Sequence, residues 1–285
     1  MTDSLPPCEV VRVFTNTGKN GNGLAVFPDA RGFGKPFMQA IAAKLGYSET
    51  SFVLPPTMIG ADYRVRFFTP KVEIEFAGHP SIGTLWALRR SGKLKIKKNY
   101  VQQIGKRAVK ITVLPDGRIK MDQGRPTFSS GVSSKTAARL LSLEPGQVTG
   151  SPMVASTGNP HLIIPLRNIK ALREASIRMP VYKRMVSSGG APCVMPFAVY
   201  RSRTRCRMFA PALGIVEDPA TGSGVGPLAA YLVRRKLAGC SGDVRCVVEV
   251  RQGVGPPALS LLYAWVENKG GKILRVEVGG FCIAG

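Results

Sequence analysis

The sequence predicts a protein of mixed helices and strands that is built from two similar halves. The strongest signal comes from residues 64–94 and 205–237. Each stretch begins with a strand-like run ending in Phe-Thr-Pro or Phe-Ala-Pro, passes through Gly-His-Pro or Thr-Gly-Ser, and continues as an apolar helix that reaches Arg-Arg. The two stretches lie about half the chain apart, and this spacing indicates an internal duplication.

The rest of each half can be placed around this repeat. Residues 14–27 and 155–166 each put a Gly-Asn turn before an apolar run, which is typical of a hairpin. Residues 35–48 have the apolar spacing of a helix, residues 61–70 alternate as a strand, and residues 107–124 predict a hairpin around Pro-Asp-Gly. We therefore expect strand, turn, strand, helix and further strands in each half, with a second helix after a glycine-rich turn.

A boundary between the halves is predicted near the middle of the chain. Residues 124–134, "GRPTFSSGVSS", have the composition of a linker. We place one half at residues 1–127 and the other at 128–285, with the last strand free to pack on the first half.

Composition predicts a folded, strongly basic protein. The 285 residues are 44% hydrophobic, and 40 Lys and Arg against 17 Asp and Glu give a formal net charge of +23. Such a charge indicates an anionic partner, whether nucleic acid, a membrane surface or a small acidic substrate. The densest basic stretch, residues 89–107, has one aromatic residue, Tyr100, and is typical of a solvated outer face. Nucleic acid is therefore the less favoured partner.

The cysteine pattern favours neither zinc nor a disulfide framework. No CxxC pair occurs and the chain has two histidines. We expect the cysteines to be small apolar residues in a reducing compartment; they are Cys8, Cys193, Cys206, Cys240, Cys246 and Cys282. The start of the sequence lacks a signal-peptide pattern, and nowhere do 18 apolar residues run together, so we predict a cytoplasmic protein without a membrane partner.

The two glycine-containing helix starts are candidates for binding an anion. A helix N-terminus offers unpaired amide N–H groups, and glycines let a ligand approach them. Pseudo-twofold packing would bring residues 77–83 and 220–226 together across a cleft between the halves. His79 and Asp218 lie at matching places in the two turns. The competing interpretation is two tight turns with ordinary capping residues and a structural histidine.

Glu49, in "GYSETSFV", is a third candidate. It follows the predicted helix and enters an apolar segment, where partial burial would raise its pKa and suit it to move a proton. From the residues alone, a surface glutamate near a helix end is the simpler interpretation.

Taken together, these motifs resemble the phenazine-biosynthesis (PhzF-like) isomerase family, part of the diaminopimelate epimerase and proline racemase fold group. The resemblance spans nearly the whole chain and rests on "SETSFVLP", "FFTPKVEIEFAGHPSIGT", "STGNPHLIIPL", "FAPALGIVEDPATGSGVGPLAAYL" and "RVEVGG". It implies an α+β fold with two pseudo-symmetric halves. Each half would be a curved, mostly antiparallel sheet or open barrel around a central helix. The resemblance further implies a homodimer that needs no cofactor or metal.

The resemblance also implies roles for particular residues. It makes Glu49 the acid and base, in place of the surface interpretation, with His79 and Asp218 assisting the proton transfer or orienting the substrate. The residues expected to bind a small anionic substrate are Ser48, Gly78, Pro80, Gly222 and Ser223.

The positions just before the two glycine-rich helix starts separate two mechanisms. Racemases of this fold group use a cysteine at each of them, because one thiolate removes the proton while the other thiol delivers one. Here those positions are Ala77 and Thr221. We therefore predict a cofactor-independent isomerase that moves a proton within an unsaturated, carboxylate-bearing substrate. The alternatives are a non-catalytic basic binding protein on the same scaffold and a two-base epimerase or racemase.

Overall fold

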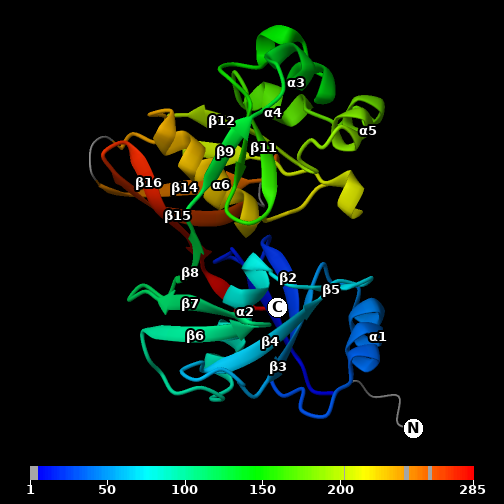
Figure 1. The fold of residues 1–285 in the computed structure, drawn as a ribbon, viewed down its shortest axis with the longest axis vertical. Helices are drawn as coiled ribbons and strands as arrows, with labels where there is room; N and C mark the ends of the chain where they lie inside the picture. The colour runs from blue at the N-terminus through cyan, green and yellow to red at the C-terminus, as the bar shows by residue number, and fades with distance from the viewer. Residues whose placement is uncertain (1–5, 202, 241–243, 256–258) are drawn as a thin grey trace. The chain divides into compact units, whose positions relative to one another are not determined.

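The structure is a computed structural model that describes residues 6–201, 203–240, 244–255 and 259–285. The chain divides into two compact units (Figure 1). Unit 1 comprises Met1–Asp122 and Gly279–Gly285, and unit 2 comprises Gln123–Val278. Strands β8 and β16 each run across a change of unit.

Unit 1 contains a mostly antiparallel sheet. Its strands are β1 (Glu9–Val13), β2 (Asn22–Phe27), β3 (Thr50–Leu54), β4 (Tyr63–Phe68), β5 (Glu73–Ile74), β6 (Asn99–Ile104), β7 (Arg107–Val113), β8 (Ile119–Gly124) and β17 (Cys282–Ala284). The order is β17-β1-β2-β3-β4-β6-β7-β8, with β5 added beside β4. The β2–β3 and β4–β6 pairs are parallel, and the others are antiparallel.

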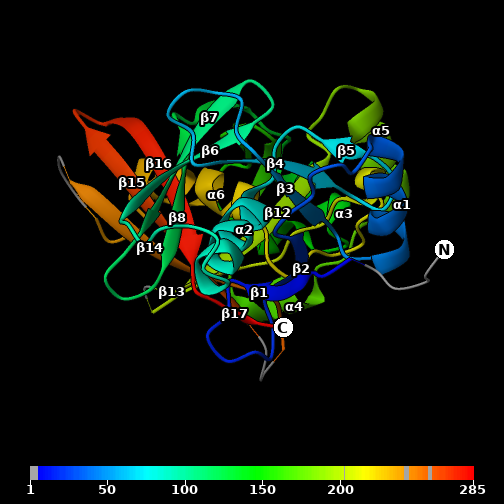
Figure 2. The same ribbon diagram turned by 90° about the horizontal axis from the view of Figure 1, so that it is seen from below.

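One helix of unit 1 is central and the other covers the opposite face of the sheet. Helix α2 (Gly78–Arg90) is buried along most of its length and contacts β1, β2, β3 and β17 (Figure 2). Helix α1 (Lys35–Leu45) places Met38 and Ile41 in a cluster with three phenylalanines from β2, β3 and β4. It stops before the predicted end at residue 48, because Gly46 has φ 70° and its N–H bonds to Ala42 O.

The strands of unit 2 pair in the same way. Its strands are β9 (Thr127–Ser130), β10 (Met153–Ser156), β11 (Pro160–Pro165), β12 (Cys193–Tyr200), β13 (Arg203–Cys206), β14 (Arg245–Gln252), β15 (Ser260–Lys269) and β16 (Lys272–Gly280). The pairing order is β9-β10-β11-β12-β13-β14-β15, with β11–β12 and β13–β14 parallel.

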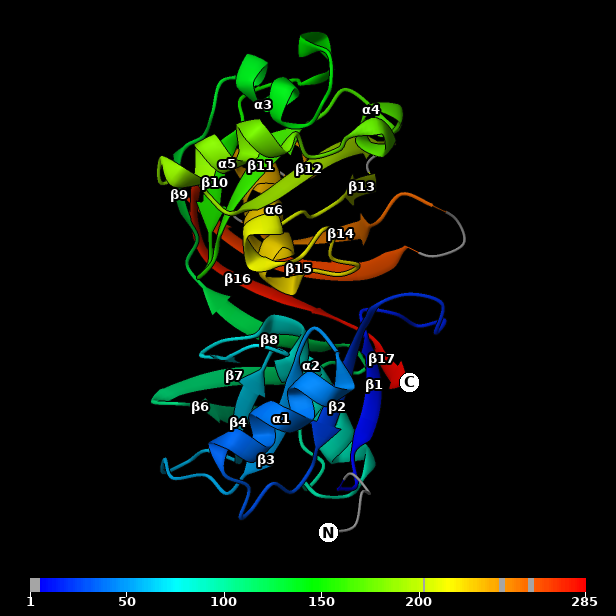
Figure 3. The ribbon, with the colours of Figure 1, turned by 90° about the vertical axis from the view of Figure 1, so that its right-hand side faces the viewer.

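Helix α6 (Gly222–Arg234) is the central helix of unit 2. It contacts β10 and β11 at one end of the strand order and β14 and β15 at the other. A sheet whose two ends contact the same helix must curve around it. A helical layer covers the other face of the sheet: α3 (Ser134–Leu140), α4 (Ile169–Glu174) and α5 (Met179–Ser187) (Figure 3). Two short 3₁₀ turns, Pro145–Gln147 and Pro211–Leu213, complete the unit.

The two units repeat the same topology. In unit 1 the pairs β1–β2, β3–β4 and β6–β7 are antiparallel hairpin-like pairs joined by parallel neighbours, and β10–β11, β12–β13 and β14–β15 follow the same sequence in unit 2. The central helix comes after β4 and the short β5 in one unit and after β13 in the other. The predicted α+β fold of two pseudo-symmetric halves, each a curved and mostly antiparallel sheet around a helix, is confirmed.

The stretch predicted as a linker is structured. Residues 124–134 include strand β9, which pairs antiparallel with β10 from Thr127↔Ser156 to Ser130↔Met153. Its Ser and Thr side chains lie mostly exposed, as on a solvated edge strand, so composition alone gave the wrong local structure.

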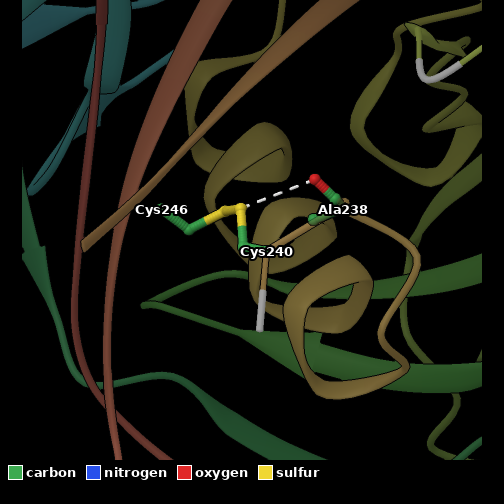
Figure 4. Close-up of a disulfide and its surroundings, with 3 residues drawn as sticks. All are labelled: Ala238, Cys240 and Cys246. Atoms are coloured by element: carbon green, nitrogen blue, oxygen red, sulfur yellow. Dashed lines mark hydrogen bonds between the residues drawn. A yellow bond between two sulfur atoms is a disulfide. The ribbon is translucent and has the colours of Figure 1, made fainter. Parts of the chain in front are cut away.

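One cysteine prediction is wrong. Cys240 and Cys246 form a disulfide that joins the segment after α6 to strand β14, across a Cα–Cα distance of 6.0 Å (Figure 4). The two cysteines have a sequence separation of 6, so the bridge is a single short-range pairing and not part of a disulfide framework. Cys193, Cys206 and Cys282 are buried thiols as predicted, whereas Cys8 is exposed.

No helix in the described part of the chain is long and apolar enough to cross a membrane.

Candidate functional site

Glu49 lies in the short connection between α1 and β3. Its side chain is 21% exposed, and the strand that it precedes is almost wholly buried. The neighbouring Ser48 donates a hydrogen bond from its hydroxyl to Asn22 Oδ1 at 3.2 Å, which fixes the turn. The carboxyl group is therefore held at the edge of an apolar segment.

Burial sets the protonation behaviour of Glu49. Loss of water raises the pKa of its carboxyl group above the ordinary value of 4.5, and the nearby Ser48 side chain opposes this shift in part. The carboxyl oxygen Oε2 makes no hydrogen bond with any described residue, and the same holds for the buried hydroxyls of Thr50 and Ser51. A buried carboxyl oxygen without a partner is unusual in a folded core and is a common feature of sites that receive a ligand.

His79 faces Glu49 from the start of helix α2. The Nε2 atom of His79 lies 3.6 Å from Glu49 Oε2, and the histidine is 6% exposed. The residue occupies the first turn of α2, together with Gly78 and Pro80, where a proline costs no helical hydrogen bond. Unit 1 thus brings together a carboxyl group of raised pKa and an imidazole at just beyond hydrogen-bond distance.

Asp218 belongs to a closed hydrogen-bond network in unit 2. Its Oδ2 accepts a bond from the Thr221 hydroxyl, and its backbone N–H bonds to Met208 O at 3.0 Å. The amide of Gln252, on β14, donates to Asp218 O at 2.6 Å and to Thr221 Oγ1 at 2.9 Å, and accepts from Thr221 N–H at 2.9 Å. All three residues are buried, so this network holds the turn before α6 in one conformation.

The first turn of α6 combines available amides with a close approach of backbone. Within the described residues, no acceptor contacts the N–H of Gly222 or Ser223, whereas Gly224 and Val225 bond back to Thr221 O. A side chain at Gly224 would lie 3.0 Å from the ring of His161, so the helix start approaches that ring closely. This end of α6 has the positive dipole and the free donors that an anionic group requires.

His161 is neutral in this position. Burial lowers its pKa to about 4, and its Nδ1 lies 2.9 Å from Asn159 O, which as a carbonyl can only accept. Nδ1 therefore carries the proton, and the Nε2 lone pair has no donor among the described residues.

A second glutamine supports α6 one turn further on. Gln123 donates from Nε2 to Gly222 O at 3.0 Å and accepts from the Thr157 hydroxyl at 2.8 Å. Gly226 packs directly on this amide, because a Cβ at that position would overlap Gln123 Oε1. Gln123 therefore fixes the position of the first residue of α6 through its bond to Gly222, and it limits how large the residue at position 226 can be.

The structure places no thiol at either helix start. The N-cap residues of α2 and α6 are Ala77 and Thr221. Burial raises the pKa of the Cys193 thiol to about 11, and it also raises the pKa values of Cys206 and Cys282, so these thiols stay protonated near neutral pH. Among the described residues, no group of three or more His, Cys, Asp or Glu is placed to hold a metal ion.

The predicted site residues thus fall into two sets. Unit 1 holds Ser48, Glu49, Gly78, His79 and Pro80, with Glu49 and His79 facing each other; unit 2 holds Asp218, Gly222 and Ser223 around the start of α6.

Several supporting residues were not predicted from the sequence, chiefly Gln252, Gln123 and His161. A signal existed for Gln252: it occupies the buried face of an otherwise alternating strand, in line with Cys246, Val248 and Val250.

Solved structures share this fold. A phenazine biosynthesis protein of the PhzF family from Bacillus anthracis matches with a TM-score of 0.87 and 27% identity, covering 97% of this chain and 96% of that one. A probable proline racemase from Agrobacterium radiobacter K84 matches with a TM-score of 0.66 at 13% identity, covering 98% and 90%, which shows a common fold alone. The fold is that of the racemase, epimerase and PhzF group of enzymes.

Sequence comparison defines the family within that group. The model of the phenazine biosynthesis-like protein family matches residues 11–284, and the chain belongs to this family. A relative from Pseudomonas fluorescens, named trans-2,3-dihydro-3-hydroxyanthranilate isomerase, is 35% identical over 274 residues that cover 95% of this chain and 94% of the relative. The predicted family and the predicted isomerase class are both confirmed.

Proposed function

We propose that this isomerase moves a proton within a small, unsaturated, carboxylate-bearing substrate and that Glu49 is its acid and base. The observation that carries the proposal is the buried carboxyl group of Glu49, whose pKa is raised by loss of water and whose Oε2 has no hydrogen-bond partner among the described residues. A carboxyl group with a raised pKa can both take and return a proton near neutral pH.

The proposed reaction balances without any added reagent. The Glu49 carboxylate takes a proton from one carbon, and the electron pair of the broken C–H bond forms a new double bond. The electrons of the original double bond then take a proton from Glu49 at a second carbon. The double bond shifts, and the carboxylate is restored.

The other residues would position the substrate and its charge. His79, 3.6 Å from Glu49, would stabilise the ionised carboxylate or orient the substrate. The amides of Gly222 and Ser223 would bind the substrate carboxylate, with Asp218 holding their turn through Thr221. Ser48, Gly78 and Pro80 would complete the contacts.

One property of the sequence and one of the structure favour a single carboxylate over a pair of thiols as the acid and base. Ala77 and Thr221 stand where a racemase needs cysteines, and the buried thiols of the chain have raised pKa values. We also propose a cytoplasmic homodimer that works without a cofactor. Light scattering on the purified protein measures the oligomeric state.

Glu49→Gln tests the mechanism because it keeps the shape of the side chain and removes its titration. The first compound to assay is trans-2,3-dihydro-3-hydroxyanthranilate, for which the Pseudomonas fluorescens relative is named. In deuterated water, NMR follows both conversion and deuterium entry at carbon. We expect Glu49→Gln to lose about 10²-fold or more in rate.

Glu75→Gln is the matched control, since Glu75 is an exposed glutamate in the same unit, just before α2. We expect it to keep the wild-type rate. If Glu49→Gln keeps the wild-type rate of turnover and exchange, the proposed role of Glu49 is wrong. Tight, strongly salt-dependent binding of nucleic acid with no turnover of any small acid would favour the basic binding protein instead.

A further inference from the structure

A cavity of about 630 Å³ lies in unit 2, apart from the residues assigned above. Its walls come from β9, β10, β11, α3 and α5 and from the segment after α5, all within residues 130–191. We call it the α3–α5 groove. Its volume is in the range of pockets that bind small organic molecules.

The groove lies on the face of the sheet opposite to α6. Along β11 successive side chains point to opposite faces: the ring of His161 lies against Gly224 of α6, whereas Leu162 belongs to the core cluster under α3, α4 and α5. Leu162 lines the groove. In Figure 3, α3 lies above β10 and β11 and α6 lies below them. The groove and the start of α6 are therefore separated by the thickness of the sheet.

The lining combines an apolar floor with cations and hydroxyls. Val132, Val154, Leu162, Val181 and Met185 supply apolar surface. Three exposed arginines, Arg139, Arg178 and Arg184, line the same cavity, together with the hydroxyls of Ser130, Thr136 and Ser188. No Asp or Glu is among the lining residues.

These arginines differ from others in the chain. Many arginines pair with a neighbouring carboxylate: Arg31 with Asp29, Arg66 with Glu73, Arg118 with Asp116, Arg207 with Glu217 and Arg251 with Glu249. Within the described residues, Arg139, Arg178 and Arg184 form no such ion pair. Three guanidinium groups around one cavity without a counter-charge attract an anion, and a guanidinium fits phosphate oxygens with two parallel hydrogen bonds.

We propose that the α3–α5 groove binds a small organic phosphate, with the phosphate on the arginines and an apolar body on the floor. A phosphate monoester suits the site better than a carboxylate, because its charge of about −1.5 to −2 and its three acceptor oxygens match several guanidinium groups at once. The proposal does not depend on the reaction proposed for Glu49.

Titration calorimetry with 1-naphthyl phosphate tests this inference on the whole chain. We expect saturable binding that is tighter than that of inorganic phosphate, of 1-naphthol or of 1-naphthoate. The triple variant Arg139→Gln, Arg178→Gln, Arg184→Gln should weaken binding at least tenfold. The substituted side chains are exposed, so we expect the fold to persist, and the melting temperature checks this.

The matched control removes the same charge from other exposed arginines of unit 2: Arg125→Gln, Arg173→Gln, Arg203→Gln. We expect this variant to bind within about twofold of wild type. Equal weakening by both triple variants would mean general charge attraction and would overturn the proposal, as would the absence of saturable binding by the wild type. Equal affinity for 1-naphthoate would overturn the choice of phosphate.

Amide chemical shifts locate the bound probe without any substitution. We expect 1-naphthyl phosphate to shift amides lining the groove, within residues 130–191. Shifts confined to residues near Glu49 or the start of α6 would place the probe in the candidate active site and overturn the groove as its binding site.

Discussion

Helices α2 and α6 hold equivalent places in their units, but the polar groups around their first turns are satisfied differently. Beside α2, Glu49 Oε2 lies 3.6 Å from His79 Nε2, and the hydroxyls of Thr50 and Ser51 lack partners among the described residues. Before α6, the Thr221 hydroxyl donates to Asp218 Oδ2 and accepts from Gln252 Nε2, which also donates to the backbone carbonyl of Asp218. The Glu49 carboxyl beside α2 is thus held by few hydrogen bonds, whereas the turn before α6 is held by several.

This difference suits the two tasks that we propose for these turns. A group that takes and returns a proton cannot be locked in a strong hydrogen bond, because that bond would favour one protonation state. A group that fixes the position of a bound anion gains from rigidity, since no reorganisation is then needed on binding. Duplication supplied two similar helix starts, and the residues around them set these different properties.

The largest difference in stability between the two helices should come from replacing the glycines at which each helix packs closely on its neighbours. A Cβ at Gly226 would displace the amide of Gln123 and break its bonds to Gly222 and Thr157. We expect Gly226→Ala to lower the free energy of unfolding by about 2–3 kcal/mol. Denaturant unfolding measures this loss.

Gly83→Ala is the counterpart in unit 1. Its Cβ would lie 2.7 Å from Leu24 Cδ2 and 2.8 Å from Val13 Cγ2, so it meets an apolar wall without breaking a hydrogen bond. We expect a smaller loss of about 1–2 kcal/mol.

Adding Gln123→Ala to Gly226→Ala should relieve part of the stability lost by Gly226→Ala alone. Strict additivity of the two changes would contradict the contact between Gly226 and Gln123.

The next largest difference in stability should be between removing a hydrogen-bonded hydroxyl near α6 and removing an unbonded one in α2. Thr221→Val keeps the shape of the side chain but leaves Asp218 Oδ2 and Gln252 Nε2 each without one buried partner. We expect a loss of about 1–2 kcal/mol in unfolding free energy. Thr84→Val is the matched control in α2, because the buried Thr84 hydroxyl has no hydrogen bond within the described residues.

We expect Thr84→Val to leave stability unchanged or to raise it slightly, since no bond is lost and a buried hydroxyl is removed. Equal losses for the two valine variants would show that the hydroxyl of Thr221 contributes nothing special to the turn.

The smallest effect should be a pH dependence that comes from Glu49. Burial raises its pKa above 4.5, so the folded chain binds this proton more tightly than the unfolded chain does. The resulting stability is complete below the unfolded pKa and is lost as pH rises through the folded pKa. Relative to wild type, Glu49→Gln should therefore gain stability as pH rises from about 4 to neutral. Urea unfolding at several pH values measures the gain, and a difference between the two proteins that does not change with pH would contradict it.

The sequence predicted the outline of this molecule because its strongest patterns are local. Apolar periodicity and the repeated turns sufficed for the two halves, for helices α1, α2 and α6 and for strands such as β4, β7 and β8, whereas α3, α4 and α5 were not predicted. Contacts between residues far apart in the chain gave no such signal. The bond from Gln252 to Asp218 and the support of α6 by Gln123 depend on pairings that only the folded sheet creates. Strand β9 was missed because its pairing with β10 outweighs its loop-like composition.

The discontinuity of unit 1 has a consequence for synthesis on the ribosome. Strand β1 pairs with β17, and the N–H groups of Phe14 and Gly285 bond to Phe281 O and Val10 O. Unit 2 is continuous in the chain, so all of its residues have been made once residue 278 is added. Unit 1, although its first strands are translated earliest, must keep the edge of β1 unpaired until residues 279–285 emerge. The half that is made first is therefore the half that is finished last.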